Sequence, residues 1–226
     1  MAETLLQEEA VAIPVDRDEL AGDLVRPPGA TALVLFAHGS GSTRHSPRNR
    51  WVASQLQEAG LGTLLFDLLT PGEQEEDERT RIHRFDIELL SERLRVAAEW
   101  ALALEGGEPP AIGFFGASTG AAAALSAAAE MGSRVGAIVC RGGRPDLAGS
   151  SALAKVRAPT LLIVGETDRE VVALNASAFE HLRCHRSLAV VPRAGHLFEE
   201  PGTLEIAAQH ACSWFTRHLM WDQREG

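Results

Sequence analysis

Short apolar runs alternate along the chain with longer stretches in which apolar residues recur at helical spacing. Residues 31–39 (TALVLFAHG) and 160–165 (TLLIVG) are mostly apolar, as is typical of strands buried on both faces of a sheet. Residues 87–104 place apolar side chains three or four positions apart, which predicts an amphipathic helix. The alternation of such strands and helices favours an α/β fold, with a mostly parallel sheet and helices on both of its faces.

The same pattern predicts about eight strands in all. The first two, at residues 10–15 and 19–27, are expected to form an antiparallel hairpin. A helix opens at Pro47, an Ala-rich helix starts near residue 120, and a last helix covers about residues 204–219. The other strands are expected at residues 31–39, 62–68, 111–116, 135–140, 160–165 and 188–192, with a turn at residues 106–110.

Two segments between these elements decide whether anything covers the edge of the sheet. Residues 71–84 (PGEQEEDERTRIHR) are polar and charged, and we interpret them as a solvent-exposed loop without chemistry. Residues 141–159 leave room only for a loop and one short helix, so no lid domain is expected. Because the sequence shows no internal repeat and no linker, we interpret residues 1–226 as a single α/β domain.

Composition narrows the class of protein further. The formal net charge of −10 argues against a nucleic-acid partner, because such proteins present basic surfaces to phosphates. The three cysteines lack metal-binding spacing and are typical of reduced thiols. The start MAETLLQEEA does not resemble a signal peptide, and no apolar run reaches the roughly 20 residues that span a bilayer. We therefore expect a cytoplasmic protein that does not bind a membrane and needs no metal or organic cofactor. Its oligomeric state stays open.

The segment 113–125 (GFFGASTGAAAAL) contains the pattern G-x-S-x-G between a predicted strand and a predicted helix. This context is what a nucleophile elbow requires, because the turn exposes a serine hydroxyl in a strained conformation. Gly116 and Gly120 supply the small residues that the turn needs on either side of Ser118. The glycines could instead serve only a tight turn. A phosphate-binding loop is disfavoured, because neither G-x-G-x-x-G nor the Walker lysine is present.

A serine hydroxyl needs a base to remove its proton, and the base needs a carboxylate to fix its tautomer. Where a nucleophile elbow occurs, the chain order is serine, acid, histidine. Asp168 and His196 each closely follow a predicted strand, so both fall at the edge of the sheet where Ser118 lies. We predict Ser118 as nucleophile, Asp168 as acid and His196 as base. Glu166 and Glu170 flank Asp168 and are alternative acids.

The remaining histidines are poorer candidates for the base. Those before Ser118 do not fit the expected chain order, and those after it lie in or beside predicted helices. His38 is expected to brace its own loop through a hydrogen bond rather than to move protons. The histidines set aside in this way are His38, His45, His83, His181, His185, His210 and His218.

The negative charge that develops on a carbonyl oxygen during such a reaction needs two N–H donors. One is expected from the backbone of Thr119, which follows the nucleophile. The other is expected from the loop HGSGSTRHSPRNR after the strand 31–39, with the backbone of Ser40 as the predicted donor. Losing one such donor typically lowers the rate about 10²–10³-fold. We therefore count both backbone donors as part of the predicted site.

The chain resembles the α/β-hydrolase superfamily, and within it the dienelactone-hydrolase-like branch, in the segments HGSGSTRHSPRNR, DLLTPGE, GFFGASTGAAAAL, RGGRPDLAG and HLFEEPG. The resemblance runs from about residue 30 to the end and implies a small serine hydrolase of a kind found alone or joined to phosphoribosyltransferase domains. Dienelactone hydrolases carry a cysteine nucleophile, whereas this chain has Ser118. The resemblance therefore favours ordinary ester hydrolysis over dienelactone hydrolysis.

The expected substrate is a small or short-chain carboxylic ester, because a site without a lid is open to water and does not enclose a long acyl chain. The same three residues could instead cleave a lactone or a thioester. A third hypothesis is a non-catalytic module that only binds a ligand, although such a module has no chemical need for serine, aspartate and histidine together.

Two arginine clusters flank the expected site. Arg44, Arg48 and Arg50 lie in and after the loop that holds Ser40, and Arg141 and Arg144 follow the strand 135–140. Such cations could bind a substrate carboxylate or phosphate through charge-assisted hydrogen bonds, and Arg44 and Arg141 are the candidates. The favoured alternative is that the arginines pair with nearby carboxylates and hold loops together. The carboxylates in question are Asp146, Glu199 and Glu200.

Overall fold

The computed structural model describes residues 6–104 and 109–221. It contains eight strands in one sheet, which confirms the predicted number. In chain order they are β1 (Glu8–Val15), β2 (Asp18–Val25), β3 (Ala32–Ala37), β4 (Gly62–Phe66), β5 (Ala111–Ala117), β6 (Val135–Arg141), β7 (Thr160–Gly165) and β8 (Arg186–Val191).

The strands lie in the order β1-β2-β4-β3-β5-β6-β7-β8. β1 and β2 form the expected antiparallel hairpin, β2 is also antiparallel to β4, and every other neighbouring pair is parallel. β3 and β7 are buried at every position, as their apolar sequences predict for central strands. The predicted turn at residues 106–110 lies partly outside the described residues, and the prediction of one domain over residues 1–226 stays a prediction.

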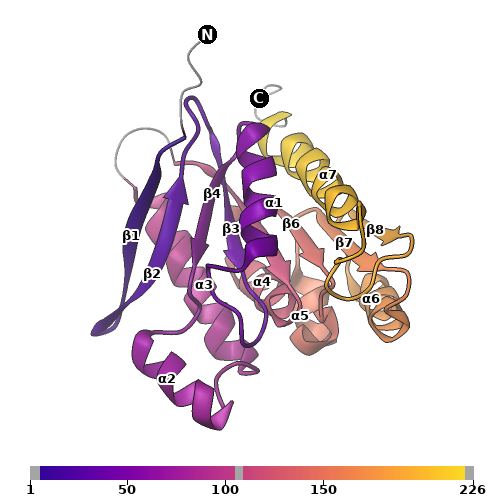
Figure 1. Cartoon of the computed structure of the whole chain (residues 1–226), viewed down its shortest axis with the longest axis horizontal. Coiled ribbons are helices and arrows are strands. Elements are labelled where there is room, and N and C mark those ends of the chain that lie inside the picture. The colour runs from indigo at the N-terminus through magenta and orange to yellow at the C-terminus, as the bar shows by residue number, and fades with distance from the viewer. Residues whose placement is uncertain (1–5, 105–108, 222–226) are drawn as a thin grey trace.

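Helices cover both faces of the sheet, as expected (Figure 1). On one face, α1 (Pro47–Glu58) packs beside α7 (Thr203–Phe215), which continues as a π-helical turn over Thr216–Trp221. The other face carries α3 (Ile87–Leu102), α4 (Thr119–Met131), α5 (Gly149–Lys155) and α6 (Arg169–His181).

The charged segment after β4 is a helix, so its interpretation as a loop was wrong. Residues Pro71–Thr80 form α2, and its first turn carries a capping box. The Thr70 hydroxyl accepts the Glu73 N–H at 3.4 Å, and the Glu73 carboxylate accepts the Thr70 N–H at 2.8 Å. Proline at the first helical position favours the same start. The sequence T-P-x-E therefore contained the signal, and the absence of an apolar stripe concealed it.

α2 lies close to the loop that follows β3. Its residues Gln74 and Asp77, with Arg84 just beyond it, line a cavity of about 10 Å³ together with residues 38–42. Such a volume holds about one water molecule. Between β6 and β7 the chain forms only a 3₁₀ turn (Pro145–Ala148) and α5, so no lid is present over the described sheet edge. Among the described helices, none has the length and apolar character needed to cross a bilayer.

Candidate active site

Ser118 lies at the sharp turn between β5 and α4, with φ 52° and ψ −122°. Such a conformation is strained for a residue other than glycine and persists only where the surroundings enforce it. A Cβ atom added at Gly116 would lie 2.5 Å from the Cα of Ala121, and one at Gly120 would lie 2.1 Å from the carbonyl oxygen of Ala37. The turn therefore requires both glycines of G-x-S-x-G for steric reasons.

Ser118 and Asp168 share an unusual position, because each precedes the first residue of a helix. Serine and aspartate in this position normally accept a hydrogen bond from the first turn of the helix. Neither side chain does so here, at α4 or at α6. The Ser118 hydroxyl and the Asp168 carboxylate thus stay available for other partners.

The Asp168 carboxylate instead binds the imidazole of His196. Nδ1 of His196 lies 2.7 Å from Oδ2 of Asp168, and the aspartate side chain is the less exposed of the two. A carboxylate only accepts, so Nδ1–H donates and Nε2 is left as the unprotonated nitrogen of the neutral ring. Of the alternative acids, Glu166 accepts the backbone N–H of Arg193, and Glu170 makes no hydrogen bond to His196.

Ser118 and His196 lie on either side of the segment at the end of β6. The Ser118 N–H donates to the carbonyl oxygen of Arg141 at 3.3 Å. A Cβ atom added at the next residue, Gly142, would lie 2.9 Å from the carbonyl oxygen of His196 and 3.8 Å from its Cε1. No direct hydrogen bond joins Ser118 Oγ to His196 within the described ranges, and in substrate-free sites such contacts often tighten only on binding.

The loop that carries His196 is held by residues that the sequence analysis did not assign to it. Glu200 accepts the Gly195 N–H at 3.0 Å, and this hydrogen bond lowers the pKa of Glu200. Thr167 donates its hydroxyl hydrogen to the carbonyl oxygen of Ala194 at 2.9 Å. The loops of the acid and the base are therefore tied to each other directly, which no local sequence pattern reveals.

The loop after β3 approaches the nucleophile closely. His38 braces it: Nδ1 donates to the Gly39 carbonyl at 3.0 Å, and Nε2 accepts the Leu68 N–H at 3.1 Å. Burial lowers the pKa of His38, which favours the neutral ring. The Ser40 N–H, predicted to face substrate, donates to the Thr119 hydroxyl at 2.8 Å.

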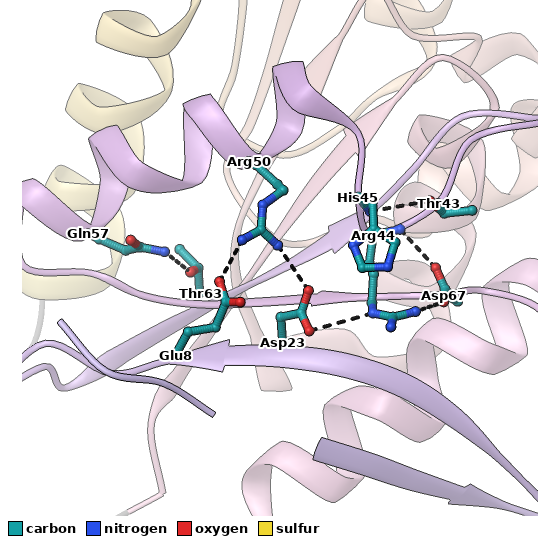
Figure 2. A network of polar contacts seen from close by, with 9 residues as sticks. All are labelled: Glu8, Asp23, Thr43, Arg44, His45, Arg50, Gln57, Thr63 and Asp67. Carbon is teal, nitrogen blue, oxygen red and sulfur yellow. Dashed lines mark hydrogen bonds and ion pairs between the residues drawn. The ribbon is translucent and has the colours of Figure 1, made fainter. Parts of the chain in front are cut away.

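Arg44 belongs to a group of paired charges beside β2, which we call the arginine–aspartate network (Figure 2). Its guanidinium binds the Asp67 carboxylate, its backbone N–H donates to the same group at 2.8 Å, and its Nε lies 3.5 Å from Asp23. Arg50 binds Asp23 at 3.0 Å and Glu8 at 2.7 Å. The network consists of Glu8, Asp23, Arg44, Arg50 and Asp67.

Arg141 differs from the other arginines of the two clusters. It is 7% exposed, its Nη2 donates to Asn49 at 3.2 Å, and its Nη1 has no hydrogen-bond partner among the residues that the structure describes. Its guanidinium lies 5.7 Å from the ring centre of Phe115 and 5.9 Å from that of Phe198. Burial, and then the nearby Arg48, lower the pKa of Arg141 to about 10, so the group is charged at neutral pH.

The other two arginines have carboxylate partners, as the pairing hypothesis expects. Arg48 binds Glu199 at 3.2 Å, and Arg144 binds Asp146 at 2.8 Å. Among the residues that the structure describes, no group of three or more His, Cys, Asp or Glu side chains is arranged to hold a metal ion.

This sheet order, with a serine at a strained turn after β5 and an aspartate–histidine pair after β7 and β8, defines an α/β-hydrolase fold. Residues 30–218 match the family described as alpha/beta hydrolase domain, and the chain belongs to that family. The predicted resemblance to its dienelactone-hydrolase-like branch is confirmed by a solved relative. A dienelactone hydrolase from Anabaena variabilis ATCC 29413 is 56% identical, with a TM-score of 0.92 over 95% of this chain and 99% of its own.

Two further likenesses bear on what this chain is similar to. Est1E from Butyrivibrio proteoclasticus shares the fold, with a TM-score of 0.78 at 15% identity over 92% of this chain and 98% of its own. Proteins from two Mycobacterium tuberculosis strains, provisionally named phosphoribosyl transferases, are 52% identical over 218 residues, which is 96% of this chain. These residues make up 48% of each relative, so the chain spans about half the length of these curated proteins.

Proposed function

We propose that this chain is a serine hydrolase that cleaves small or short-chain carboxylic esters through an acyl-enzyme on Ser118. The observation that carries the proposal is the 2.7 Å hydrogen bond between Asp168 and His196, next to a serine held in a strained turn. Asp168 fixes the imidazole with its proton on Nδ1, so that Nε2 can act as a base. The dipole of α4, whose first turn begins at Thr119, favours negative charge at the same place.

The proposed reaction has two stages, acylation of Ser118 and hydrolysis of the acyl-enzyme. Ser118 Oγ attacks the ester carbonyl carbon, its proton passes to His196 Nε2, and the carbonyl electron pair moves to the oxygen. The tetrahedral intermediate collapses, the C–O bond to the alcohol breaks, and His196 returns the proton to the leaving alcohol. A water molecule then repeats the sequence on the acyl-enzyme and releases the carboxylic acid.

The short connection between β6 and β7 supports a small substrate. The 3₁₀ turn and α5 leave the described edge of the sheet without a covering domain that could enclose a long acyl chain. A lactone is the second candidate, because the 56% identical Anabaena protein is named a dienelactone hydrolase. We assign this hydrolytic role to the part that the Mycobacterium tuberculosis relatives share with this chain and propose no phosphoribosyl transfer for it.

A fluorophosphonate probe tests the proposal, because it reacts only with an activated serine. Labelling of the wild type but not of Ser118→Ala supports catalysis, whereas absence of labelling in both favours a ligand-binding module. Asp168→Asn is expected to lower kcat by about 10⁴, because the imidazole then adopts the wrong tautomer. Near-normal activity in that variant would transfer the acid role to Glu166 or Glu170.

A panel of p-nitrophenyl esters and simple lactones separates the two substrate classes. We expect kcat/KM to fall steadily as the acyl chain lengthens, because the open edge offers no enclosed acyl tunnel. We extend the proposal to substrate charge through Arg141, which alone among the arginines of the two clusters has no carboxylate partner within the described residues. A carboxylate on the substrate would supply the anion that this cation lacks.

A further inference from the structure

Thr119 brings a hydroxyl as well as a backbone N–H to the expected oxyanion site. The residue is 3% exposed, and its Oγ1 accepts the Ser40 N–H at 2.8 Å. The two residues are 79 positions apart in the sequence, so the fold creates this contact. The Ser40 N–H is therefore already used by a protein oxygen rather than directed at a substrate.

The donors of Thr119, in contrast, are not used. A hydroxyl has one hydrogen to donate and two lone pairs to accept with, and Ser40 occupies one lone pair. Within residues 6–104 and 109–221, the Thr119 hydroxyl hydrogen has no acceptor. The Thr119 N–H is the first amide of α4, and helix geometry leaves such an amide without an intrahelical acceptor.

Both donors lie beside the reacting oxygen. Thr119 is bonded to Ser118, and the loop that its hydroxyl contacts lies against the nucleophile. A Cβ atom added at Gly39 would lie 3.0 Å from Ser118 Cβ and 3.7 Å from Ser118 Oγ. The Thr119 hydroxyl therefore belongs to the wall that the nucleophile turn and this loop form beside Ser118, next to the place where the carbonyl oxygen of a bound ester would lie.

We infer that the Thr119 hydroxyl, and not the Ser40 N–H, is the second donor to the oxyanion. The inference rests on the proposed function and specifies its catalytic groups. When Ser118 Oγ attacks, the carbonyl electron pair moves to oxygen, and the N–H and O–H of Thr119 both donate to it. Ser40 keeps its hydrogen bond to Oγ1 and polarises the hydroxyl, which strengthens the bond that the hydroxyl donates.

Thr119→Val and Thr119→Ser test the inference with a short-chain p-nitrophenyl ester. Valine keeps the shape but removes the donor, so kcat is expected to fall about 10²–10³-fold. Serine keeps the hydroxyl, and its kcat is expected to stay within about tenfold of the wild type, with KM little changed in both. If Ser40 were the donor, valine would release its N–H toward the substrate, and a kcat within about threefold of the wild type would overturn the inference.

Thr160→Val is the matched control, because Thr160 is a fully buried threonine at the start of β7, the end of that strand opposite Asp168. Its loss is expected to lower the melting temperature without the drop in kcat. A boronic acid that mimics the tetrahedral intermediate adds a second readout. Its Ki in Thr119→Val is expected to rise by the factor by which kcat/KM falls, because both depend on the same oxyanion contact. An unchanged Ki contradicts the inference.

Three further outcomes have a definite meaning for the inference. If Thr119→Val does not fold, Thr119→Ala removes the same hydroxyl with a residue that favours a helix, and retained kcat in that variant overturns the inference. If the wild type neither hydrolyses esters nor reacts with the fluorophosphonate, the proposed function fails, and the inference fails with it. If the wild type is active and Thr119→Val and Thr119→Ala keep its kcat, the inference is wrong and the proposed function is not affected.

Discussion

The arginine–aspartate network and Arg141 use the same side chain in opposite ways. In the network, the Arg44 and Arg50 guanidinium groups each contact two carboxylate-bearing residues, and these contacts join β1, β2 and the start of α1 (Figure 2). Arg141, at the end of β6 beside Ser118, is more deeply buried, and among the described residues its guanidinium contacts the Asn49 amide oxygen and two aromatic rings but no carboxylate.

The difference separates charges that hold the fold together from a charge that the fold leaves unbalanced. Removing an ion from water costs several kcal/mol, and a carboxylate partner offsets much of that cost. The network arginines have such partners, whereas Arg141 has none among the described residues. An unbalanced buried cation beside the proposed nucleophile is consistent with an anion supplied by the substrate.

The largest effect on the free energy of unfolding is expected at an ion pair in which the carboxylate, rather than the arginine, is the buried partner. Asp77 is 1% exposed and accepts from Arg84 Nε at 2.7 Å and from the backbone N–H groups of His83 and Arg84 at 2.9 Å. Asp77→Asn is expected to lower the free energy of unfolding by about 3–5 kcal/mol, because it leaves Arg84 without its partner. Urea unfolding measures the change, and Glu75→Gln, an exposed residue of the same helix, is the control.

The same pair predicts a pH dependence with a definite sign. Burial disfavours the charged form of Asp77, but hydrogen bonds from Arg84 and from the His83 backbone outweigh it and lower the pKa of Asp77. Its contribution to stability is therefore complete above the unfolded pKa of about 4 and is lost as pH falls through the lower folded pKa. The stability difference between wild type and Asp77→Asn is expected to shrink below about pH 4. A constant difference down to pH 2 would show that the charge is not its cause.

The next effect concerns substrate binding by Arg141. If a substrate carboxylate binds this cation, Arg141→Met raises KM for esters that carry a carboxylate by about 10–100-fold, the equivalent of about 1.5–3 kcal/mol for a charge-assisted hydrogen bond. KM for neutral esters of the same size is expected to stay unchanged. Steady-state kinetics on matched pairs of anionic and neutral p-nitrophenyl esters measure the difference.

Arg44→Met is the matched control for this experiment, because its guanidinium is already bound by Asp67 and Asp23. It is expected to leave the ratio of the two KM values unchanged. An equal rise of both KM values in Arg141→Met would mean that the residue only shapes the site. A selective rise in Arg44→Met would mean that pairing does not prevent an arginine from binding substrate.

The sequence predicted the fold well because the decisive signals are local. Apolar runs predict strands β3 and β7, and an alternating pattern of apolar and polar residues predicts the hairpin of β1 and β2. α2 was missed for the opposite reason, since its stability comes from a capping box and a buried ion pair and not from an apolar stripe. A charged segment can therefore be helical when its polar groups are satisfied at specific positions.

In the site, sequence order brought Asp168 and His196 together, because consecutive strands of a parallel sheet end at the same edge. What it could not give is the partner of each polar group. The Ser40 amide was expected to face substrate and instead binds Thr119. The arginines were expected to pair with Asp146, Glu199 or Glu200, but Arg44 pairs with Asp67 and Asp23, and Arg50 pairs with Asp23 and Glu8. These contacts join residues far apart in the sequence, and only the packed structure fixes them.

A smaller effect on stability is expected for the network itself. Arg44→Met leaves Asp67 without its cation, although Asp23 keeps Arg50. The free energy of unfolding is expected to fall by about 1–2 kcal/mol, near the lower end of the range for a charge-assisted hydrogen bond, because both side chains are partly exposed to water. Arg141→Met is expected to change it by less than about 1 kcal/mol in either direction, because replacing an uncompensated buried ion with an apolar side chain is often neutral. Denaturant unfolding of both variants makes the comparison.

The smallest effect is expected for Arg48, which is paired but exposed. Its bond to Glu199 measures 3.2 Å, and the two side chains are 36% and 66% exposed. Arg48→Met is expected to change the free energy of unfolding by less than about 0.5 kcal/mol, because water and salt screen such pairs. The free energy of unfolding of both proteins is measured in dilute buffer and in about 0.5 M salt. A loss above about 1 kcal/mol in Arg48→Met under both conditions would show that exposure does not weaken the pair. The presence of a carboxylate partner, whether buried or exposed, would then be what distinguishes the network from Arg141.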